Sequence, residues 1–343
     1  MASSPSRPAV VDPHPVDQHP ADQHLINLKP AADRFLDDVL AGLAAAPKAL
    51  PPKYFYDARG CALFEAICEL PEYYPTRVEL ALMADHAQAM AAQLPSGCTL
   101  IEFGSGASRK TEALLQTLRP AAYVPVDIAI EALRDSTARL AGKFPQLPMT
   151  AVCADYMQPL QVPELTQLPG QRRVIYFPGS TIGNLTPGEA LEFLRRGGKL
   201  AGTGGAMLIG VDLKKDPQVL HAAYNDAQGV TAEFNLNLLR RINRELAADF
   251  DLDCFRHIAF YNAVAGRIEM HLESVRAQAV TVSGRTFAFA AGERIHTENS
   301  YKYSVAEFQR LAQDAGFRPQ QVWVDSEQRF AVHLLTLCVT GCG

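Results

Sequence analysis

The sequence predicts a doubly wound α/β fold that is interrupted by an inserted α+β segment. Between residues 98 and 212, short apolar runs alternate with stretches of helical periodicity. Runs that are apolar throughout indicate strands buried on both faces of a parallel sheet. From 214 to 303 this alternation stops, and a long helical stretch leads into several strand-like segments. After residue 304 a helix and two strands return to the first pattern.

The composition is that of an ordinary globular chain with a mild negative charge. Of its 343 residues, 48% are hydrophobic and 20% are charged, which suits a large core. The net charge of -5, without a basic stripe, argues against a nucleic-acid partner, so we expect a small-molecule substrate. Seven scattered cysteines without a CxxC pair are typical of a reduced, cytoplasmic protein. We find no secretory signal and no run approaching about 18 apolar residues, so we expect no membrane partner.

Residues 1–25 have the composition of a disordered leader. They hold five prolines and a near-repeat of a four-residue segment. His14, His19 and His24 offer a weak metal-binding alternative. A polar, proline-rich stretch cannot bury enough apolar surface to fold, so we favour the disordered leader and expect no metal site in the chain.

Three helical stretches precede the alternating region. The first, 33–43, places Phe35, Val39 and Leu43 on one face. A segment rich in proline and tyrosine at 51–60 ends it, and an apolar helix is expected from 61 to 70. A turn rich in aromatic rings follows at 71–77, where Thr76 can cap a third helix that runs to about residue 94.

The strands of the parallel sheet are predicted from five apolar runs. They lie at 99–103, 123–127, 150–155, 173–177 and 206–212. In the insertion, a helix around 231–250 is followed by predicted strands at 257–262, 267–274, 279–283 and 286–290. The spacing of Ser304 to Glu307 fits a capping box at the start of a helix that ends near Gly316. Strands at 321–325 and 329–337 close the chain, and the last is expected to run antiparallel.

A glycine-rich turn marks a candidate nucleotide site. The segment Glu102-Phe103-Gly104-Ser105-Gly106 follows a predicted strand and precedes a helix expected near Thr111, the position at which open α/β sheets bind nucleotides. Its glycines allow a ligand to approach the backbone, and the helix N-terminus favours a carboxylate. The third glycine of a dinucleotide fingerprint is absent, which disfavours an NAD-dependent oxidoreductase.

Two further acidic residues extend this turn into a nucleotide site. Asp127 ends the next strand, where its carboxylate can accept the ribose hydroxyls, and Asp155 ends the third strand, where it can accept an adenine amino group. Together with Glu102, acids at three strand ends are the pattern expected for S-adenosylmethionine (SAM). An aspartate at a strand end is also a common turn former or helix cap. We interpret the set as a SAM site.

Four motifs that occur in a fixed order carry a family resemblance. They are the stretch 177–185, which contains Gly179 and Asn184, and the segments 51–57, 70–77 and 296–303. From about residue 28 to 337 the chain resembles the histidine Nα-methyltransferases of ergothioneine biosynthesis, which convert L-histidine to hercynine. The resemblance implies a Rossmann-like class I methyltransferase sheet, formed by 79–213 and 304–343. It also implies a substrate-binding domain, formed by 26–78 and 214–303.

The same resemblance implies a role for each site residue. SAM, which leaves as S-adenosylhomocysteine, would be bound by the glycine turn, the acids and their neighbours: Gly104, Ser105, Gly106, Lys110, Asp127, Asp155 and Tyr156. L-histidine and its mono- and dimethyl forms would be bound by Tyr56, Tyr73, Gly179, Asn184, Tyr224, Phe234, Met270, Glu298 and Ser300. Of these, Asn184 and Tyr56 would hold the reacting nitrogen, and Glu298 and Ser300 would bind the imidazole. Tyr74 is an alternative to Tyr73.

Methyl transfer from sulfur to nitrogen is an in-line displacement, so it requires alignment and a free lone pair more than a strong base. Two other functions stay open at this point. One is SAM-dependent N-methylation of another amino acid or small amine, such as tryptophan or a histidine derivative. The other is a non-catalytic regulator that binds SAM or a metabolite.

Overall fold

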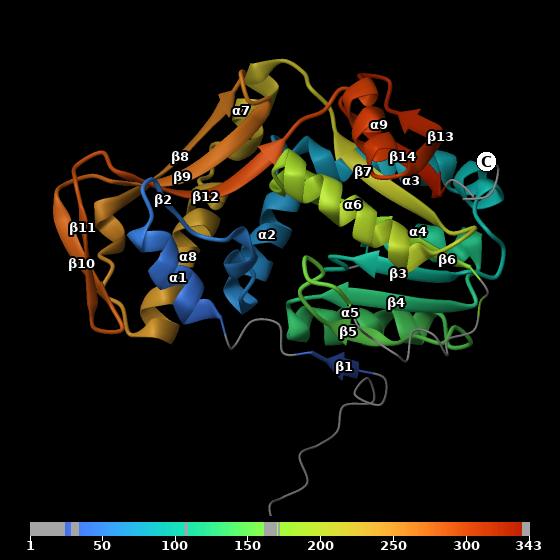
Figure 1. The fold of residues 1–343 in the computed structure, drawn as a ribbon, viewed down its shortest axis with the longest axis horizontal. Coiled ribbons are helices and arrows are strands. Elements are labelled where there is room, and N and C mark those ends of the chain that lie inside the picture. Colours follow the sequence, from blue (N-terminus) through green and yellow to red (C-terminus); the bar gives the residue numbers. More distant parts are fainter. Residues whose placement is uncertain (1–24, 29–33, 107–108, 161–169, 171, 338–343) are drawn as a thin grey trace, which may run out of the picture.

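The computed structural model describes residues 25–28, 34–106, 109–160, 170 and 172–337, and it contains a large and a small β-sheet that lie side by side (Figure 1). The proposed leader, apart from Leu25, lies outside the described residues, as do His14, His19 and His24. The predicted doubly wound α/β class is confirmed. No helix within the described ranges is both long and apolar enough to cross a membrane.

The large sheet has eight strands in the order β1-β5-β4-β3-β6-β7-β14-β13. The strands β3, β4, β5, β6 and β7 run parallel to their neighbours, and β14 runs antiparallel to β7, with Leu334 opposite Leu208. The predicted antiparallel last strand is therefore confirmed. The strands are β1 (Leu25–Asn27), β3 (Thr99–Phe103), β4 (Ala122–Asp127), β5 (Ala151–Cys153), β6 (Arg173–Phe177), β7 (Ala206–Asp212), β13 (Phe317–Val324) and β14 (Phe330–Leu337).

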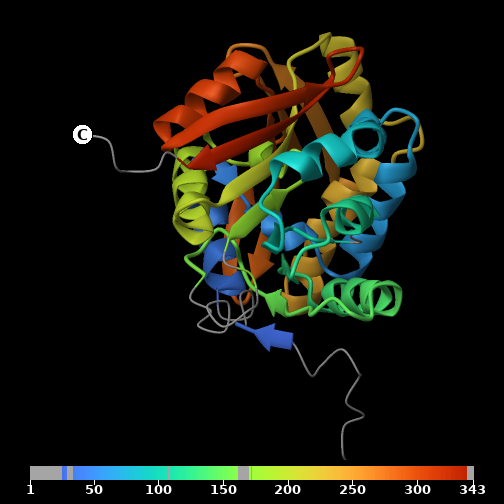
Figure 2. The same cartoon turned by 90° about the vertical axis from the view of Figure 1, so that its right-hand side faces the viewer.

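Helices lie on both sides of this sheet (Figure 2). Because side chains alternate along a strand, Leu100 of β3 packs among residues of α3 and α4, while Ile101 packs among residues of α6 and α9. The two cores explain why the strands are apolar throughout. The helices are α3 (Tyr74–Gln93), α4 (Arg109–Leu118), α5 (Ile130–Lys143), α6 (Pro187–Ala201) and α9 (Val305–Asp314).

The small sheet has the order β2-β12-β9-β8, and a separate hairpin, β10–β11, completes the insertion. One core joins these strands to the helices around them. The strands are β2 (Lys48–Ala49), β8 (Phe255–Asn262), β9 (Arg267–Ser274), β10 (Gln278–Val282), β11 (Arg285–Phe289) and β12 (Arg294–Tyr301). The helices are α1 (Phe35–Ala44), α2 (Ala58–Glu69), α7 (Pro217–Tyr224) and α8 (Val230–Leu246), with 3-10 turns η2 (Pro52–Phe55), η4 (Thr181–Asn184) and η5 (Leu252–Cys254).

One of the two predicted helix caps is present in the structure and the other is not. Ser304 and Glu307 form the predicted capping box, with Glu307 N donating to Ser304 Oγ at 3.2 Å. The predicted Thr76 cap is wrong, because α3 already begins at Tyr74 and Thr76 lies inside its first turn. Pro75 explains the earlier start, since its fixed φ and missing N–H suit the first turn of a helix.

Several elements lie outside the sequence-based expectations, among them the short strand β2. The disordered leader was expected to extend to residue 25, but β1 begins at Leu25 and pairs with β5, with Leu25 opposite Ala151. The helix α7 and the strand β12 were not expected as elements, and Glu298 lies within β12. The proposed boundaries between the two domains stay a prediction.

Candidate functional site

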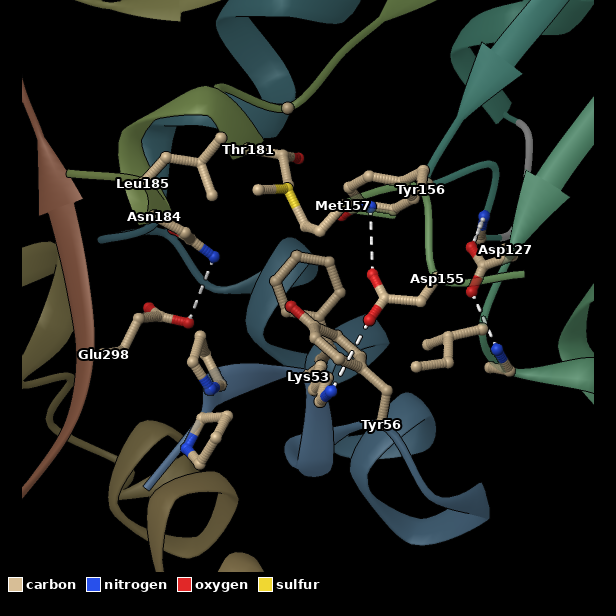
Figure 3. Close-up of a pocket in the computed structure, with 18 of the residues that line it drawn as sticks. Lys53, Tyr56, Asp127, Asp155, Tyr156, Met157, Thr181, Asn184, Leu185 and Glu298 are labelled. Atoms are coloured by element: carbon tan, nitrogen blue, oxygen red, sulfur yellow. Dashed lines mark hydrogen bonds and ion pairs between the residues drawn. The ribbon is translucent and has the colours of Figure 1, made fainter. Parts of the chain in front are cut away.

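A cavity of about 1050 Å³ opens between the two sheets. Residues that follow β3, β4, β5 and β6 line one side, at the carboxyl ends of the parallel strands, and residues of η2, α2 and β12 line the other. Figure 3 shows Asp127, Asp155 and Tyr156 facing Lys53 and Tyr56 across this space. Every residue that the sequence analysis assigned to the methyl donor lines the cavity: Gly104, Ser105, Gly106, Lys110, Asp127, Asp155 and Tyr156.

The glycine turn and Asp127 form one hydrogen-bonded unit. Gly104 and Gly106 adopt φ values of 68° and 46°, which glycine reaches without steric cost. Gly106 N donates to Asp127 Oδ2 at 2.9 Å, and Ala129 N donates to Asp127 Oδ1 at 2.9 Å. Burial raises the pKa of Asp127, and these backbone N–H groups oppose that rise. The carboxylate is thereby held in one orientation beside the cavity.

Asp155 lies opposite a lysine that the sequence analysis did not include. Its Oδ1 accepts a hydrogen bond from Met157 N at 2.9 Å, and Lys53 Nζ lies 3.5 Å from its Oδ2 (Figure 3). Tyr156 stacks on Phe103 with ring centroids 5.7 Å apart. Lys53 belongs to η2, which was singled out as a motif, but no local pattern paired it with Asp155.

Glu102 is one of the three acids in the predicted pattern. Both of its carboxyl oxygens already accept hydrogen bonds from neighbouring side chains. Thr111 Oγ1 donates to Glu102 Oε1 at 2.5 Å, and the Tyr123 hydroxyl donates to Oε2. Burial raises the pKa of Glu102 to about 8, although both hydroxyls oppose the rise. Glu102 therefore links the glycine turn to Thr111 of α4 and Tyr123 of β4 through hydrogen bonds.

A second buried glutamate, Glu79 of α3, organises the other wall and was missed from the sequence. Its carboxylate accepts the Gly179 N–H at 2.9 Å and forms an ion pair with Lys110. Gly210 of β7 gives it room, because a Cβ there would lie 2.1 Å from Glu79 Oε1. The available signal was weak, because α3 also contains the charged residues Arg77 and Asp85 and its sequence does not distinguish a buried glutamate from an exposed one.

A smaller pocket of about 60 Å³ adjoins the cavity. Tyr56, Asn184 and Glu298 line both spaces, so the two are contiguous. The nine residues assigned to the acceptor all line this inner pocket, although they come from seven segments of the chain: Tyr56, Tyr73, Gly179, Asn184, Tyr224, Phe234, Met270, Glu298 and Ser300. Their predicted roles stay predictions.

Asn184 and Glu298 meet at the border between the two spaces. Asn184 Nδ2 donates to Glu298 Oε2 at 3.4 Å (Figure 3). Burial raises the pKa of Glu298 to about 7, against the opposing charge of Lys302. A carboxyl group with this pKa changes its hydrogen-bonding role near neutral pH.

Aromatic rings form the other walls of the inner pocket. Tyr56 makes an edge contact with Phe234 at a centroid distance of 5.9 Å, and Tyr73 makes one with Tyr224 at 6.4 Å. Tyr74 points elsewhere, because its hydroxyl donates to the carboxylate of Asp212 at 2.7 Å. Of the two neighbouring tyrosines, Tyr73 is therefore the one that lines the pocket.

A buried polar network closes the far end of the inner pocket. The Tyr224 hydroxyl donates to Ser300 Oγ at 2.7 Å, and Lys302 Nζ donates to Ser300 Oγ at 2.7 Å. Lys302 also forms a 2.7 Å ion pair with Asp212, the last residue of β7. Neither Lys302 nor Asp212 was found from the sequence, because each lies where the chain crosses between the two sheets and is positioned only by the tertiary fold.

One further group of side chains has metal-binding chemistry. Ligand atoms of Glu269, His271 and His296 lie within 4.8 Å of one another. The guanidinium of Arg267 already pairs with Glu269 at 2.7 Å and compensates its charge. The pocket chemistry derived below uses none of these groups.

The family match and the most similar of the compared proteins point to the same family. Residues 35–337 match the family described as histidine-specific, SAM-dependent methyltransferase. The chain is 42% identical to a histidine N-alpha-methyltransferase of Mycolicibacterium smegmatis, over 89% of this chain and 95% of that protein. It is 41% identical to a protein of the same name from Mycobacterium tuberculosis, over 87% and 93%. It is 32% identical to ergothioneine biosynthesis protein 1 of Neurospora crassa, over 84% of this chain and 33% of that protein.

Proposed function

The chain belongs to the family of histidine-specific, SAM-dependent methyltransferases, and from this premise we propose that it trimethylates the α-amino group of L-histidine to hercynine, a step of ergothioneine biosynthesis. The observation that carries the proposal is the junction of two spaces. A large cavity with nucleotide-binding features opens into a small pocket that has a carboxylate, hydroxyls and aromatic rings on its walls. One space suits a donor and the other an amino acid.

The residues of the large cavity fit SAM. Asp127 offers a fixed carboxylate for the ribose hydroxyls, Asp155 offers one for the adenine amino group, and Lys110 offers an ammonium for the methionine carboxylate. The glycine turn leaves the space beside these groups clear. When bound, SAM supplies an electrophilic methyl group on a sulfonium sulfur.

In the inner pocket we assign one group of residues to each part of histidine. Asn184 and Tyr56 hold the α-amino nitrogen, and Tyr73 and Tyr224 hold the carboxylate. Glu298 and Ser300 bind the imidazole, between the apolar side chains of Phe234 and Met270. Glu298 confers specificity, because a buried carboxylate left without the imidazole N–H is costly.

The amine must reach the site with a free lone pair. Burial raises the pKa of Tyr56 well above its ordinary value, so its hydroxyl stays protonated and is no base. The proton of the free ammonium therefore leaves to water before or during binding. Asn184 and Tyr56 then keep the lone pair aligned, which is the main contribution to an in-line displacement.

Three rounds of transfer leave a quaternary ammonium in the pocket. Aromatic faces bind such a cation well, since the ring quadrupole is negative over its face. Tyr56 and Tyr73 supply these faces. The pocket thereby tolerates the growing cation that the second and third rounds produce.

A direct test is mass spectrometry of the protein incubated with SAM and a mixture of the twenty amino acids. We expect trimethylated histidine as the methylated product. A different methylated amino acid would instead identify another acceptor. Absence of any methylated product, with SAM still bound, would favour a non-catalytic binding protein.

A further inference from the structure

The inner pocket contains a single basic side chain among the described residues that line it, Lys302. It directly follows β12, its side chain is 1% exposed, and its partner Asp212 is equally buried. Burial lowers the pKa of Lys302, but the Asp212 carboxylate outweighs burial, so the net pKa lies above its ordinary value. Lys302 is therefore a permanent ammonium inside the protein.

All three N–H groups of this ammonium are used. Lys302 Nζ contacts Asp212 Oδ2 at 2.7 Å, Ser300 Oγ at 2.7 Å and the Tyr224 hydroxyl at 3.2 Å. An ammonium has three donors and no acceptor, so Ser300 and Tyr224 must each accept from it. No N–H is left over to bind a substrate carboxylate directly.

This fixes the direction of the hydrogen bond that Ser300 can offer. Ser300 Oγ accepts from both Lys302 and Tyr224, which uses the two lone pairs of a hydroxyl oxygen. Its own proton is left to be donated into the pocket. When Tyr224 turns its proton to a substrate carboxylate, Lys302 still donates to Ser300 Oγ and occupies one of its two lone pairs, so the Ser300 proton remains available to the pocket.

Glu298 supplies the opposite role on the same strand. Glu298 and Ser300 are two positions apart on β12 and both line the inner pocket. The ionised carboxylate only accepts, whereas the Ser300 hydroxyl donates. A ring that satisfies both needs one N–H and one nitrogen lone pair.

We propose that Lys302 is a positioning residue that makes the pocket select the neutral imidazole of histidine, in a single tautomer, because its N–H occupies an acceptor site of Ser300 and so favours donation by Ser300 while Glu298 accepts. This inference rests on the proposed function. The imidazolium ion has two N–H donors and no lone pair, so it would leave the Ser300 proton unsatisfied. The charged groups around this pair are Lys302, Asp212 and Lys215, and the phenols of Tyr56, Tyr73 and Tyr224 also face Glu298.

The test is ¹⁵N NMR of ring-labelled histidine bound to the full chain with S-adenosylhomocysteine present. In the wild type we expect one protonated and one unprotonated ring nitrogen. In Lys302→Met the Ser300 hydroxyl can also accept a hydrogen bond, so the ring nitrogen that faces Ser300 should become partly protonated and its signal should move toward that of the imidazolium ion. The dissociation constant for histidine should rise about tenfold, and that for S-adenosylhomocysteine should change less than about twofold.

Two further variants separate this role from a loss of folding. Lys215→Met removes another lysine that pairs with Asp212 but does not line the pocket, and it should leave the histidine spectrum unchanged. If Lys302→Met does not fold, the double variant Lys302→Met/Asp212→Asn removes both charges together and should give the same shift toward the imidazolium signal. Two protonated nitrogens in the wild type, or wild-type signals in the Lys302 variants, would overturn the inference while histidine binding still supports the proposed function. A wild type that does not bind histidine would overturn both.

Discussion

At the scale of single residues, the ionisation of Glu298 should make the affinity for histidine depend on pH. Its pKa of about 7, raised by burial, means that its carboxyl group loses its proton and becomes an acceptor only as the pH rises through neutrality. Histidine binding should therefore strengthen as the pH rises through about 7, since an ionised Glu298 is the form that accepts the imidazole N–H.

The variant Glu298→Gln should remove this dependence. The amide cannot ionise, so the inflection near neutral pH disappears, and the KM for histidine rises about tenfold or more because the charged acceptor is lost. The pH profile of kcat/KM checks this expectation, with SAM affinity as the control. An unchanged profile would show that another group controls it.

The neighbouring residues Tyr73 and Tyr74 should affect different properties: Tyr73 the binding of histidine, and Tyr74 the stability of the fold. Tyr73→Phe should raise the KM for histidine with little change in unfolding, because Tyr73 lines the pocket. Tyr74→Phe removes the hydrogen bond to the buried Asp212 and should cost about 1–3 kcal/mol of unfolding free energy. Urea denaturation and steady-state kinetics of both variants test this. Equal effects of the two on KM would contradict the separation.

The sequence identified the residues that line the two spaces better than the residues behind them. Asn184, Glu298 and Asp127 stand in motifs with recognisable spacing, and they line the predicted spaces. Glu79 and Lys302 were missed, because a buried charge is defined by its distant partner and not by its neighbours in sequence.

At the scale of elements, the parallel strands were predictable because they are buried on both faces. The predicted runs 99–103, 173–177 and 206–212 coincide with β3, β6 and β7. The strand β12 escaped prediction because its sequence is mostly polar, and its burial depends on pairing with β9 and β2. The strand β1 is too short to show any periodicity.

The centre of β7 offers a test of how an element supports the donor site. Gly210→Ala would push its Cβ against Glu79, which is held by Gly179 N and Lys110. Displacing Glu79 should lower SAM affinity about tenfold and cost about 1–3 kcal/mol of stability, as overpacking does.

The matched control for this variant is Gly142→Ala in the last turn of α5, where an added Cβ meets no atom within 4 Å and the residue does not line the cavity. It should leave SAM affinity unchanged and leave stability unchanged or slightly improved, because alanine favours a helix. Isothermal titration with SAM distinguishes the two. If Gly210→Ala binds SAM normally, Glu79 does not organise the donor site.

At the scale of the whole molecule, the site exists because the chain crosses between its sheets four times, and the last two crossings lie side by side. It leaves β7 at Asp212 and returns after β12, and the backbone ties the crossings together, with Tyr303 N donating to Asp212 O at 3.2 Å. The buried Lys302–Asp212 pair lies at the same place. The inner pocket thus combines residues from Tyr56 to Lys302, a juxtaposition that no local pattern encodes.

The stability of the whole molecule should depend on pH through one buried histidine of the large sheet. His333 of β14 is fully buried, and neither ring nitrogen has a hydrogen-bond partner within the described part of the chain. Burial lowers its pKa to about 4. Between this value and the ordinary pKa of about 6.5, the unfolded chain binds a proton that the folded chain refuses, so stability falls as the pH drops through this window.

The variant His333→Leu should remove that contribution. Between pH 8 and pH 5, the wild type should lose about 2 kcal/mol more unfolding free energy than the variant, since only the wild-type unfolded state gains a proton at this position. Urea denaturation at both pH values measures the difference, and His221→Gln, at an exposed position in α7, serves as the control that should behave as the wild type does. If the wild type and His333→Leu lose stability in parallel, another group causes the acid sensitivity of the fold.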